Sequence, residues 1–365
     1  MRTTPRVEIS IAMGNRMPRP PKRPPPSPLS GGPTVPDDPT PFATLTPDRV
    51  LGAIEAAGFP CDGHLLALNS YENRVYRIGL EDGTALIAKF YRRGRWPDVA
   101  IAEEHAFAHE LAAAEIPVVA PLQRPDGTSL WIDAELRFAL FPNRPGRTPE
   151  LEDPAVLEWI GRFLGRIHAR GSAGRFKTRP GLTLERFGRE PVRYLQAQGF
   201  IPAELRPAYD SVAAAVLAQI EGIFEAVGPV RQLRLHGDCH PGNILWTPAG
   251  PHFVDLDDCL TGPAVQDLWM LLAGDREEVT GLLGHLLRGY TMFERFDPAE
   301  LALIEALRSL RMLHYAAWLA RRWTDPAFPL HFPWFNTQRY WQDQILALRE
   351  QMAAMEEPPL RYDPD

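Results

Sequence analysis

The stretch LRLHGDCHPGNILW, from Leu233 to Trp246, concentrates polar side chains between two apolar runs. His236, Asp238 and Asn243 stand in the pattern H-x-D-x-x-x-x-N, and the run FVDLDD begins ten residues after Asn243. An aspartate at the head of such a loop can accept the proton of an attacking hydroxyl or orient that hydroxyl. An asparagine five residues later and an aspartate from the next strand can together hold Mg²⁺, which prefers hard oxygen ligands, on nucleotide phosphates. The spacing therefore indicates phosphoryl transfer.

Lys89 is a second candidate, because it lies between Ala88 and Phe90 in the otherwise apolar run TALIAKFY. A buried ammonium needs a counter-ion. Glu104 is the expected partner, since it falls on the interior face of the next predicted helix beside Phe107. A strand lysine held by a helix glutamate can present a fixed cation to phosphate oxygens. The alternative is a lysine that extends along a sheet edge into solvent.

Two other chemistries compete for the same loop. A zinc site would use the residue types that suit this metal, namely His236, Cys239, His240 and Cys259. Their spacings fit no structural zinc pattern, and the site would leave the aspartate and the asparagine without a role. A thiol mechanism with Cys239 as nucleophile and His240 as base would need a third group to orient the histidine, and adjacent residues rarely face each other.

Local patterns predict the elements that must position these residues, beginning with a strand-rich segment. A capping Thr46 and Pro47 start a helix that stops at Gly58. Three β-type runs follow, around HLLALNS, RVYRIGL and TALIAKFY, and the last two are joined by EDG, a hairpin turn signal. A helix is predicted over DVAIAEEHAFAHELAAAE, and a further β run starts at Leu136. Prolines and a glycine at 142–146 then form a connector.

From about residue 150 the pattern changes to long helices, which we expect at 157–169, 208–227 and 303–323. Two short strands interrupt them, at Leu233–His236 and His252–Leu256. We therefore predict an α+β fold with two lobes. The N-lobe is a small antiparallel β-sheet with one key helix, and the C-lobe is larger and mainly helical.

The N-terminus is expected to be a disordered tail over residues 1–45, because residues 18–41 hold eleven prolines in 24 positions. Such a segment is either a ligand for a proline-binding module or a solvated extension. The expected divisions after it are an N-lobe at 46–141, a C-lobe at 142–350 and a C-terminal tail at 351–365.

The composition narrows the choice of partners and compartment. The 365 residues carry a formal net charge of −7, so no general attraction to nucleic acid or to an anionic membrane is expected. No apolar run approaches the ~18 residues that a membrane helix needs. Three cysteines without a C-x-x-C spacing argue for a reducing compartment, so we expect a cytoplasmic protein. We further expect a monomer with no nucleic-acid or membrane partner.

Several motifs also carry a family resemblance. LHGDCHPGNILW and FVDLDD resemble the catalytic loop and metal-binding segment of the aminoglycoside phosphotransferase and choline kinase group of protein-kinase-like enzymes. LGRIHA and GPAVQDLWML are similar to two further segments of that group. NSYENRVYRI, KFYRRGRW and AWLARRWTDPAFPLHFPWF are closer to the bacterial stress response kinase A family, which phosphorylates protein serine and threonine residues. The resemblance covers roughly residues 46–340 and implies a two-lobed protein-kinase-like fold that uses ATP and Mg²⁺.

The resemblance also implies roles for single residues. Asp238 would be the proton acceptor, and Asp255 would be a second catalytic residue. The Mg²⁺ ligands would be Asn243 and Asp255, and the ATP-binding residues would be Ser70, Lys89 and Glu104. Lys89, paired with Glu104, would position the α- and β-phosphates.

Some features depart from ordinary protein kinases or have more than one interpretation. NSYEN stands in place of a glycine-rich phosphate loop, and no A-P-E follows the metal-binding segment, so switching by activation-loop phosphorylation is not expected. Asp257 would either approach a second metal ion or the substrate, or act as a turn carboxylate. Asp267 is expected to anchor the catalytic loop by accepting backbone donors. Four tryptophans between Trp318 and Trp341 would line an acceptor groove or, as we expect, pack a C-terminal core.

These patterns predict a Mg²⁺- and ATP-dependent phosphotransferase whose acceptor is a serine or threonine hydroxyl of a protein. A kinase of small molecules, such as an aminoglycoside, an amino alcohol or a sugar, is the alternative with the same chemistry. A nucleotide-binding regulator without turnover is the alternative outside enzymes. The presence of Lys89, Asp238, Asn243 and Asp255 together argues against that last alternative.

Overall fold

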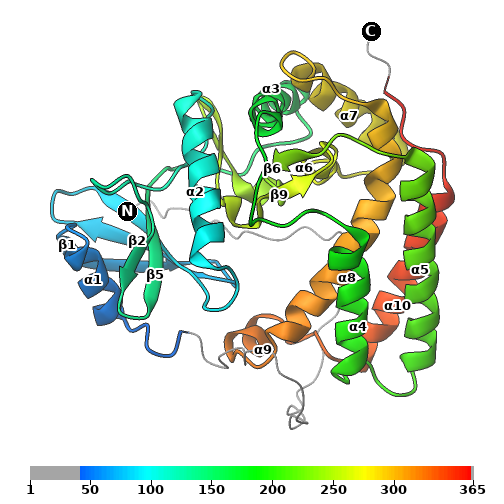
Figure 1. Ribbon diagram of the computed structural model, residues 1–365, viewed down its shortest axis with the longest axis horizontal. Coiled ribbons are helices and arrows are strands. Elements are labelled where there is room, and N and C mark those ends of the chain that lie inside the picture. Colours follow the sequence, from blue (N-terminus) through cyan, green and yellow to red (C-terminus); the bar gives the residue numbers. More distant parts are fainter. Residues whose placement is uncertain (1–41, 363–365) are drawn as a thin grey trace, which may run out of the picture.

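A computed structural model describes residues 42–362, which form two lobes joined by a connector at 142–147 (Figure 1). The predicted N-terminal tail lies outside the described residues except for 42–45. Within the described range, no helix is both long enough and apolar enough to cross a lipid bilayer. The α+β fold with two lobes that the sequence predicted is confirmed.

The small lobe is built around a five-stranded antiparallel sheet with the strand order β1-β2-β3-β5-β4. Its elements are α1 (Pro47–Ala56), β1 (Cys61–Leu68), β2 (Arg74–Leu80), β3 (Ala85–Phe90), α2 (Asp98–Ala113), β4 (Trp131–Asp133) and β5 (Leu136–Pro142). Lys89 lies on the central strand β3, paired in register with Val75 of β2 and Ala139 of β5. A lysine on the middle strand has neighbours on both sides, so the alternative of a sheet-edge lysine is wrong.

Helix α2 connects the small lobe to the core of the large lobe. Ile101, near its start, packs with Tyr91 and Ala139 of the sheet. Phe107 and Leu111, further along the same face, belong to the main hydrophobic core of the large lobe. Glu104 lies between these two contacts on the buried face, so its position is fixed from both ends of the helix.

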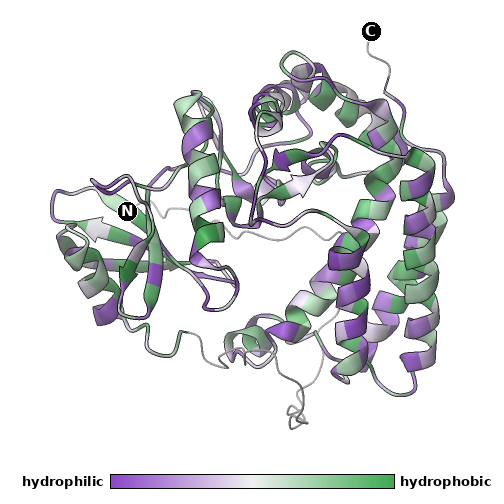
Figure 2. Cartoon of the chain, in the orientation of Figure 1, coloured by the Kyte–Doolittle hydropathy of each residue, from purple (hydrophilic) through white to green (hydrophobic). Residues whose placement is uncertain are grey.

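The large lobe is mainly helical, with two small two-stranded sheets inserted beside the lobe interface. Its helices are α3 (Pro154–Ser172), α4 (Glu190–Ala197), α5 (Arg206–Val227), α6 (Gln266–Trp269), α7 (Arg276–Tyr290), α8 (Ile304–Arg321), α9 (Ala327–His331) and α10 (Gln338–Glu356). Its strands are β6 (Leu233–Leu235), β7 (Ile244–Thr247), β8 (Gly250–Phe253) and β9 (Leu260–Gly262). Short helical turns are η1 (Glu185–Arg189, a π-helix), η2 (Pro241–Asn243), η3 (Leu256–Asp258) and η4 (Pro298–Leu303). Hydrophobic and hydrophilic residues alternate along α5 and α8 in Figure 2, as expected of helices with one buried face.

One strand ends earlier than the sequence indicated. A strand was predicted at His252–Leu256, but β8 stops at Phe253 and the turn η3 begins at Leu256. Asp255, between them, has a φ of 60°, in the left-handed region that non-glycine residues rarely adopt. The backbone therefore turns at Asp255, and such backbone strain tends to concentrate at functional sites.

Helices α3 and α7 pack unusually closely, which matters for the site described below. A Cβ atom on Gly161 of α3 would lie 2.0 Å from the carbonyl oxygen of Leu286, and one on Gly289 of α7 would lie 2.0 Å from that of Glu158. Only glycine allows this approach. It brings His168 of α3 within 3.0 Å of the Tyr290 hydroxyl of α7.

Candidate active site

The loop that follows β6 is held in place by one buried carboxylate. Asp267, at the start of α6, accepts the backbone N–H of His236 through Oδ2 at 2.8 Å and that of Gly237 through Oδ1 at 2.8 Å. Its Oδ2 also lies 3.0 Å from Nε2 of His168, which itself contacts Tyr290. The predicted anchoring role of Asp267 is confirmed by these contacts.

Asp238 lies two residues into this loop, beside an arginine of α8. The Arg311 guanidinium is 2.6 Å from Oδ1 of Asp238, and Nε2 of His240 is 3.5 Å from Oδ2. Burial raises the pKa of the Asp238 carboxyl, but the positive charge of Arg311 outweighs burial and, with His240, lowers that pKa to about 2. Asp238 is therefore a carboxylate across the physiological pH range, as a proton acceptor must be.

Asn243 and Asp255 are brought together by the antiparallel pair β7 and β8. The N–H of Val254 donates to the carbonyl oxygen of Asn243 at 3.0 Å, so Asp255 directly follows the residue paired with Asn243. The side-chain amide nitrogen of Asn243 donates to the carbonyl oxygen of Asp238 at 3.0 Å, which leaves the amide oxygen for a cation. The Asp255 side chain is about half exposed.

This donor set fits Mg²⁺. One amide oxygen and one accessible carboxylate are too few to enclose a metal ion, and the described residues contain no group of three or more His, Cys, Asp and Glu placed to do so. Magnesium usually binds with one or two protein carboxylates and completes its shell with substrate phosphates and water. Asn243 and Asp255 would hold the ion, which supplies charge neutralisation to the phosphates.

Lys89 joins the two lobes at this point. Its ammonium lies 2.8 Å from Oδ1 of Asp255, 3.3 Å from Asp257 and 3.7 Å from Glu104. Burial alone would lower the pKa of Lys89, but these three carboxylates raise it well above its usual value. The predicted contact between Lys89 and Glu104 is present, and the nearest partner of the lysine is the aspartate of the large lobe.

Glu104 shares the positive charge of Lys89 with Asp255 and Asp257, and this affects the pKa of Glu104. Burial raises the pKa of Glu104 to about 7, because the compensating charge of Lys89 is closer to Asp255 and Asp257. Arg179, 4.0 Å from Glu104, adds a weaker attraction.

Asp257 is a fully engaged carboxylate. It is buried and accepts from the side chain of Asn73 at 3.0 Å, forms an ion pair with Arg95, and lies beside Lys89. Burial raises its pKa, but Arg95, then Lys89 and Arg179, outweigh burial and hold the pKa far below its usual range. Asp257 is therefore held by side chains of both lobes, and whether it also approaches a metal ion stays a prediction.

The turn at 69–73, between β1 and β2, is attached to the large lobe. Glu72 accepts from Nε1 of Trp318 at 2.6 Å and pairs with Arg322 at 2.5 Å. Ser70 is half-buried in this turn and, within the described part of the chain, makes no hydrogen bond to the other candidate residues. The structure thus brings together Lys89, Glu104, Asp255 and Asp257, and the turn that carries Ser70 reaches this group through Asn73, which donates to Asp257 at 3.0 Å.

Several partners in this site were not predicted from the sequence. They are Asn73, Arg95, Arg179 and Arg311, which contact Asp257 or Asp238 from elements far away along the chain. The sequence gives a weak indication of Arg311, because this residue interrupts the apolar pattern of the helix LIEALRSLRMLHYAAWLARRW. Arginines 95 and 179 lie in loops, where periodicity gives no information about direction.

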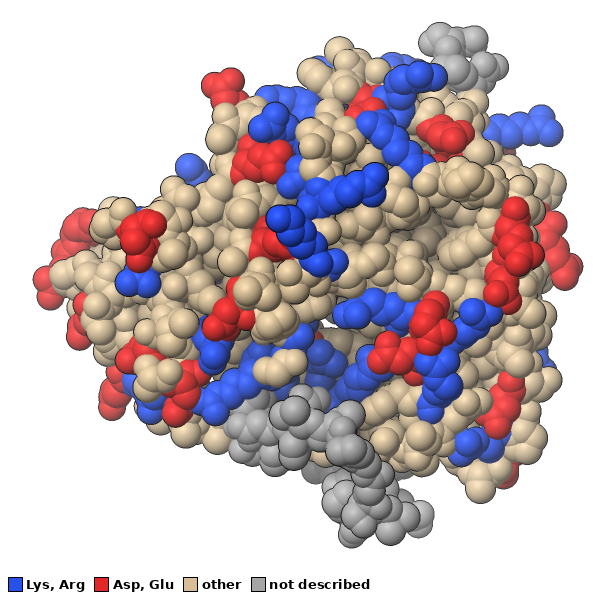
Figure 3. Space-filling view, in the orientation of Figure 1, with Lys and Arg blue, Asp and Glu red and all other residues tan. Residues whose placement is uncertain are grey.

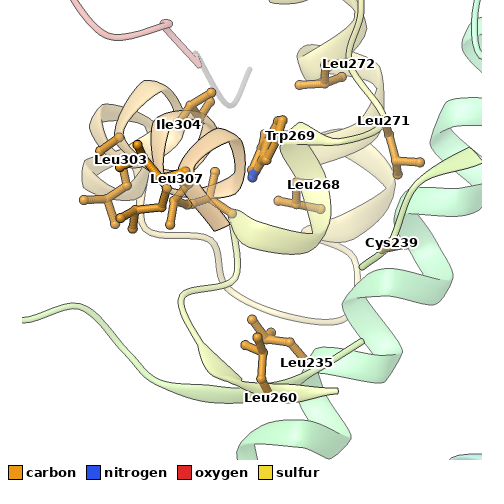
Figure 4. Packing of buried hydrophobic residues seen from close by; sticks show 14 of the residues in the cluster. Leu235, Cys239, Leu260, Leu268, Trp269, Leu271, Leu272, Leu303, Ile304 and Leu307 are labelled. Carbon is orange, nitrogen blue, oxygen red and sulfur yellow. The ribbon is translucent and has the colours of Figure 1, made fainter. Parts of the chain in front are cut away.

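The zinc and thiol alternatives do not fit the geometry. Nε2 of His236 bonds to the carbonyl oxygen of Val254 at 2.9 Å. Cys239 is buried among the leucines of the core, as Figure 4 shows, and burial raises the pKa of its thiol well above the usual value. Cys259 is equally buried, and its pKa is raised for the same reason. A packed thiol with a raised pKa is a poor nucleophile, and the described residues contain no group of three or more His, Cys, Asp and Glu placed to hold a zinc ion.

The tryptophans between 318 and 341 pack as a core rather than line an open groove. Trp341 is fully buried against Tyr209, and Trp318 packs edge-on against Phe328 and Phe332. The predicted C-terminal core is confirmed.

Comparison with known proteins places this geometry in a family. Residues 64–304 match the family described as the phosphotransferase enzyme family. Stress response kinase A of Escherichia coli (strain K12) is 44% identical over 327 residues, covering 88% of this chain and 97% of the relative. Serine/threonine protein kinase RdoA of Salmonella typhimurium is 42% identical over 323 residues, with the same coverage.

Solved structures share the fold at low sequence identity. An amicoumacin kinase in complex with AMP-PNP and Ca²⁺ has a TM-score of 0.64 at 19% identity, covering 87% of this chain and 96% of that one. A microcompartment-associated aminopropanol kinase has a TM-score of 0.63 at 17% identity, covering 86% and 99%. These similarities extend across both lobes.

Proposed function

Because this chain belongs to the phosphotransferase enzyme family, and within it to the stress response kinase A family, we propose that it transfers the γ-phosphate of Mg²⁺·ATP to serine or threonine hydroxyls of proteins. The observation that carries the proposal is the contact of Lys89 with Asp255, which joins the phosphate-binding strand of one lobe to the metal-binding turn of the other. The printed name of the relative RdoA supports a protein acceptor.

In the proposed reaction, each candidate residue has a separate role. Lys89, held by Glu104, binds phosphate oxygens, and Asn243 and Asp255 hold the metal ion. Ser70 contacts the nucleotide from the turn at 69–73. Asp238 accepts a hydrogen bond from the attacking hydroxyl and takes its proton as the bond to phosphorus forms. Catalysis comes from positioning and from neutralising phosphate charge, since little covalent chemistry is needed from the protein.

The test offers protein and small-molecule acceptors to the enzyme in one buffer. Transfer of ³²P from labelled ATP is measured to a generic protein substrate, to an aminoglycoside and to an amino alcohol. We expect label in the protein, and none after Mg²⁺ is removed with a chelator. Label in a small molecule alone would refute the protein-kinase assignment, while ATP that is bound but never consumed would refute catalysis.

Removing the charge of Arg311 is expected to change the pH dependence of this reaction. In Arg311→Met, Asp238 loses the cation that keeps its pKa low, while burial still raises that pKa. At low pH kcat/KM falls, because Asp238 becomes protonated. In the variant this fall is expected at a pH that is higher by about one to three units. The measurement is a pH profile of kcat/KM that begins at pH 2 and extends to pH 9, so that it covers the wild type as well as the variant.

Two further variants separate charge from packing. Arg311→Lys retains a positive charge and is expected to recover part of the wild-type profile. Arg308→Met removes an arginine one turn away that pairs with Glu305 at 3.2 Å, and its profile should match that of the wild type. Identical profiles for Arg311→Met and Arg308→Met would contradict the proposed role of Arg311.

A further inference from the structure

Arg311 of α8 pairs with Asp238, and a second arginine, Arg186, lies on the turn η1. The π-helix η1 packs against α8, because the Phe187 ring is 4.7 Å from the ring of His314 and Gly188 faces the side chain of Leu310. Arg186, adjacent to Phe187, therefore lies beside the turn of α8 that carries Arg311. Single π-helical turns are frequent at functional sites.

Trp96 connects this edge to the metal-binding turn. The guanidinium of Arg186 lies 6.0 Å from the centre of the Trp96 ring, and that of Arg95 lies 5.6 Å from the same ring. Arg95 in turn pairs with Asp258 at 2.5 Å. Arg186 thus lies near the loop that carries Arg95 and Trp96, and Arg95 reaches from this loop to Asp258.

Arg186 has no carboxylate partner in the part of the chain that the structure describes. It is exposed, and its guanidinium contacts only the Trp96 ring. The nearby carboxylates are occupied, because Glu185 pairs with Arg193, and Glu190 lies 3.1 Å from Arg321. Among the described residues, Arg186 is therefore a cation without a carboxylate partner, and it lies beside Trp96.

Asp238 occupies only some of the hydrogen-bond donors of Arg311. Its side chain is 37% exposed while one nitrogen holds the carboxylate, so other donors of the planar guanidinium face solvent. Burial, together with the charges of Arg321, Arg322, Arg186 and Arg311, lowers the pKa of neighbouring His314 to about 3. Figure 3 shows lysine and arginine side chains bordering the hollow between the lobes.

We propose that the acceptor is an acidic polypeptide segment, in which carboxylate side chains flank the serine or threonine, and that Arg186 and Arg311 bind these carboxylates. Arginine donors match carboxylates in paired hydrogen bonds. A cationic acceptor would meet the same arginines as like charges, and Asp258, already paired with Arg95, offers it little attraction. The inference rests on the proposed function, since it names the acceptor class of the same site.

The test compares three peptides with one central serine, flanked by Asp and Glu, by Ala and Gln, or by Lys and Arg. Wild type is expected to show the highest kcat/KM with the acidic peptide and the lowest with the basic one. Arg186→Gln is expected to lower kcat/KM for the acidic peptide about tenfold relative to the neutral peptide, without changing the KM for ATP. Arg189→Gln, on the same turn but paired with Glu221 at 2.6 Å, is the matched control and is expected to retain the wild-type preference.

The outcomes distinguish a failure of this inference from a failure of the proposed function. Equal rates with all three peptides, a preference for the basic peptide, or the same profile for Arg186→Gln and Arg189→Gln would overturn acidic recognition and leave the protein kinase intact. Phosphorylation of an aminoglycoside or amino alcohol, with no peptide accepted, would overturn both.

Discussion

Replacing Asp238 by asparagine is expected to slow phosphoryl transfer by about 10²- to 10⁴-fold, the usual contribution of a positioned general base. The amide has the shape of the carboxylate but is not a base, so the hydroxyl loses its proton acceptor. The protein should remain folded, because the Asn243 side chain bonds to the backbone oxygen of Asp238, which the substitution retains. Initial rates of ³²P transfer at saturating ATP measure the effect on kcat.

The matched control for this substitution is Asp210→Asn. Asp210 is a partly exposed residue of α5 that pairs with Arg206 at 3.3 Å, far from the lobe interface. Its loss removes a surface ion pair worth at most about 1 kcal/mol and should leave kcat unchanged. If Asp238→Asn is as active as Asp210→Asn, Asp238 is not the proton acceptor.

The sequence predicted contacts within elements and between neighbouring elements well. Glu104 was predicted to face Lys89 from helical periodicity alone, and the two side chains lie 3.7 Å apart. Asp267 was predicted to accept backbone donors of the catalytic loop, and it accepts two. Both inferences rest on local rules, namely which face of a helix is buried and which buried charge needs a partner.

The contacts that were not predicted join residues that are far apart in the sequence. Arg311 meets Asp238 from 73 residues away, and Arg95 meets Asp257 from 162 residues away. Such pairs depend on the packing of α8 and of the loop before α2, which no local pattern specifies. The left-handed Asp255 was missed for another reason, because the apolar residues Phe253, Val254 and Leu256 look like one continuous strand.

The packing of the large lobe also explains why the site keeps its shape. Gly161 and Gly289 let α3 and α7 approach each other, and this contact orients His168 toward Asp267. Asp267 then fixes the backbone from which Asp238 projects. The position of the proposed catalytic carboxylate is therefore determined by a chain of buried contacts that begins at two glycines.

Replacing Asp267 by alanine is expected to be the most destabilising change in this chain of contacts. Two backbone N–H groups, of His236 and Gly237, and the ring of His168 would lose their acceptor inside the core. Each unsatisfied buried group costs about 1–3 kcal/mol, so the free energy of unfolding is expected to fall by about 3–5 kcal/mol. Urea unfolding followed by tryptophan fluorescence measures the change.

Two variants distinguish loss of the buried acceptor from loss of a carboxylate in general. Asp267→Asn keeps the shape but offers one acceptor oxygen to two backbone donors, so it should lie close to Asp267→Ala. Asp275→Ala removes the exposed N-cap of α7, where Asp275 accepts from two backbone N–H groups, and should cost only about 1 kcal/mol. Equal losses for Asp267→Ala and Asp275→Ala would mean that the catalytic loop holds its shape without Asp267. In that case the position of Asp238 would have to depend on Arg311 and Asn243 instead.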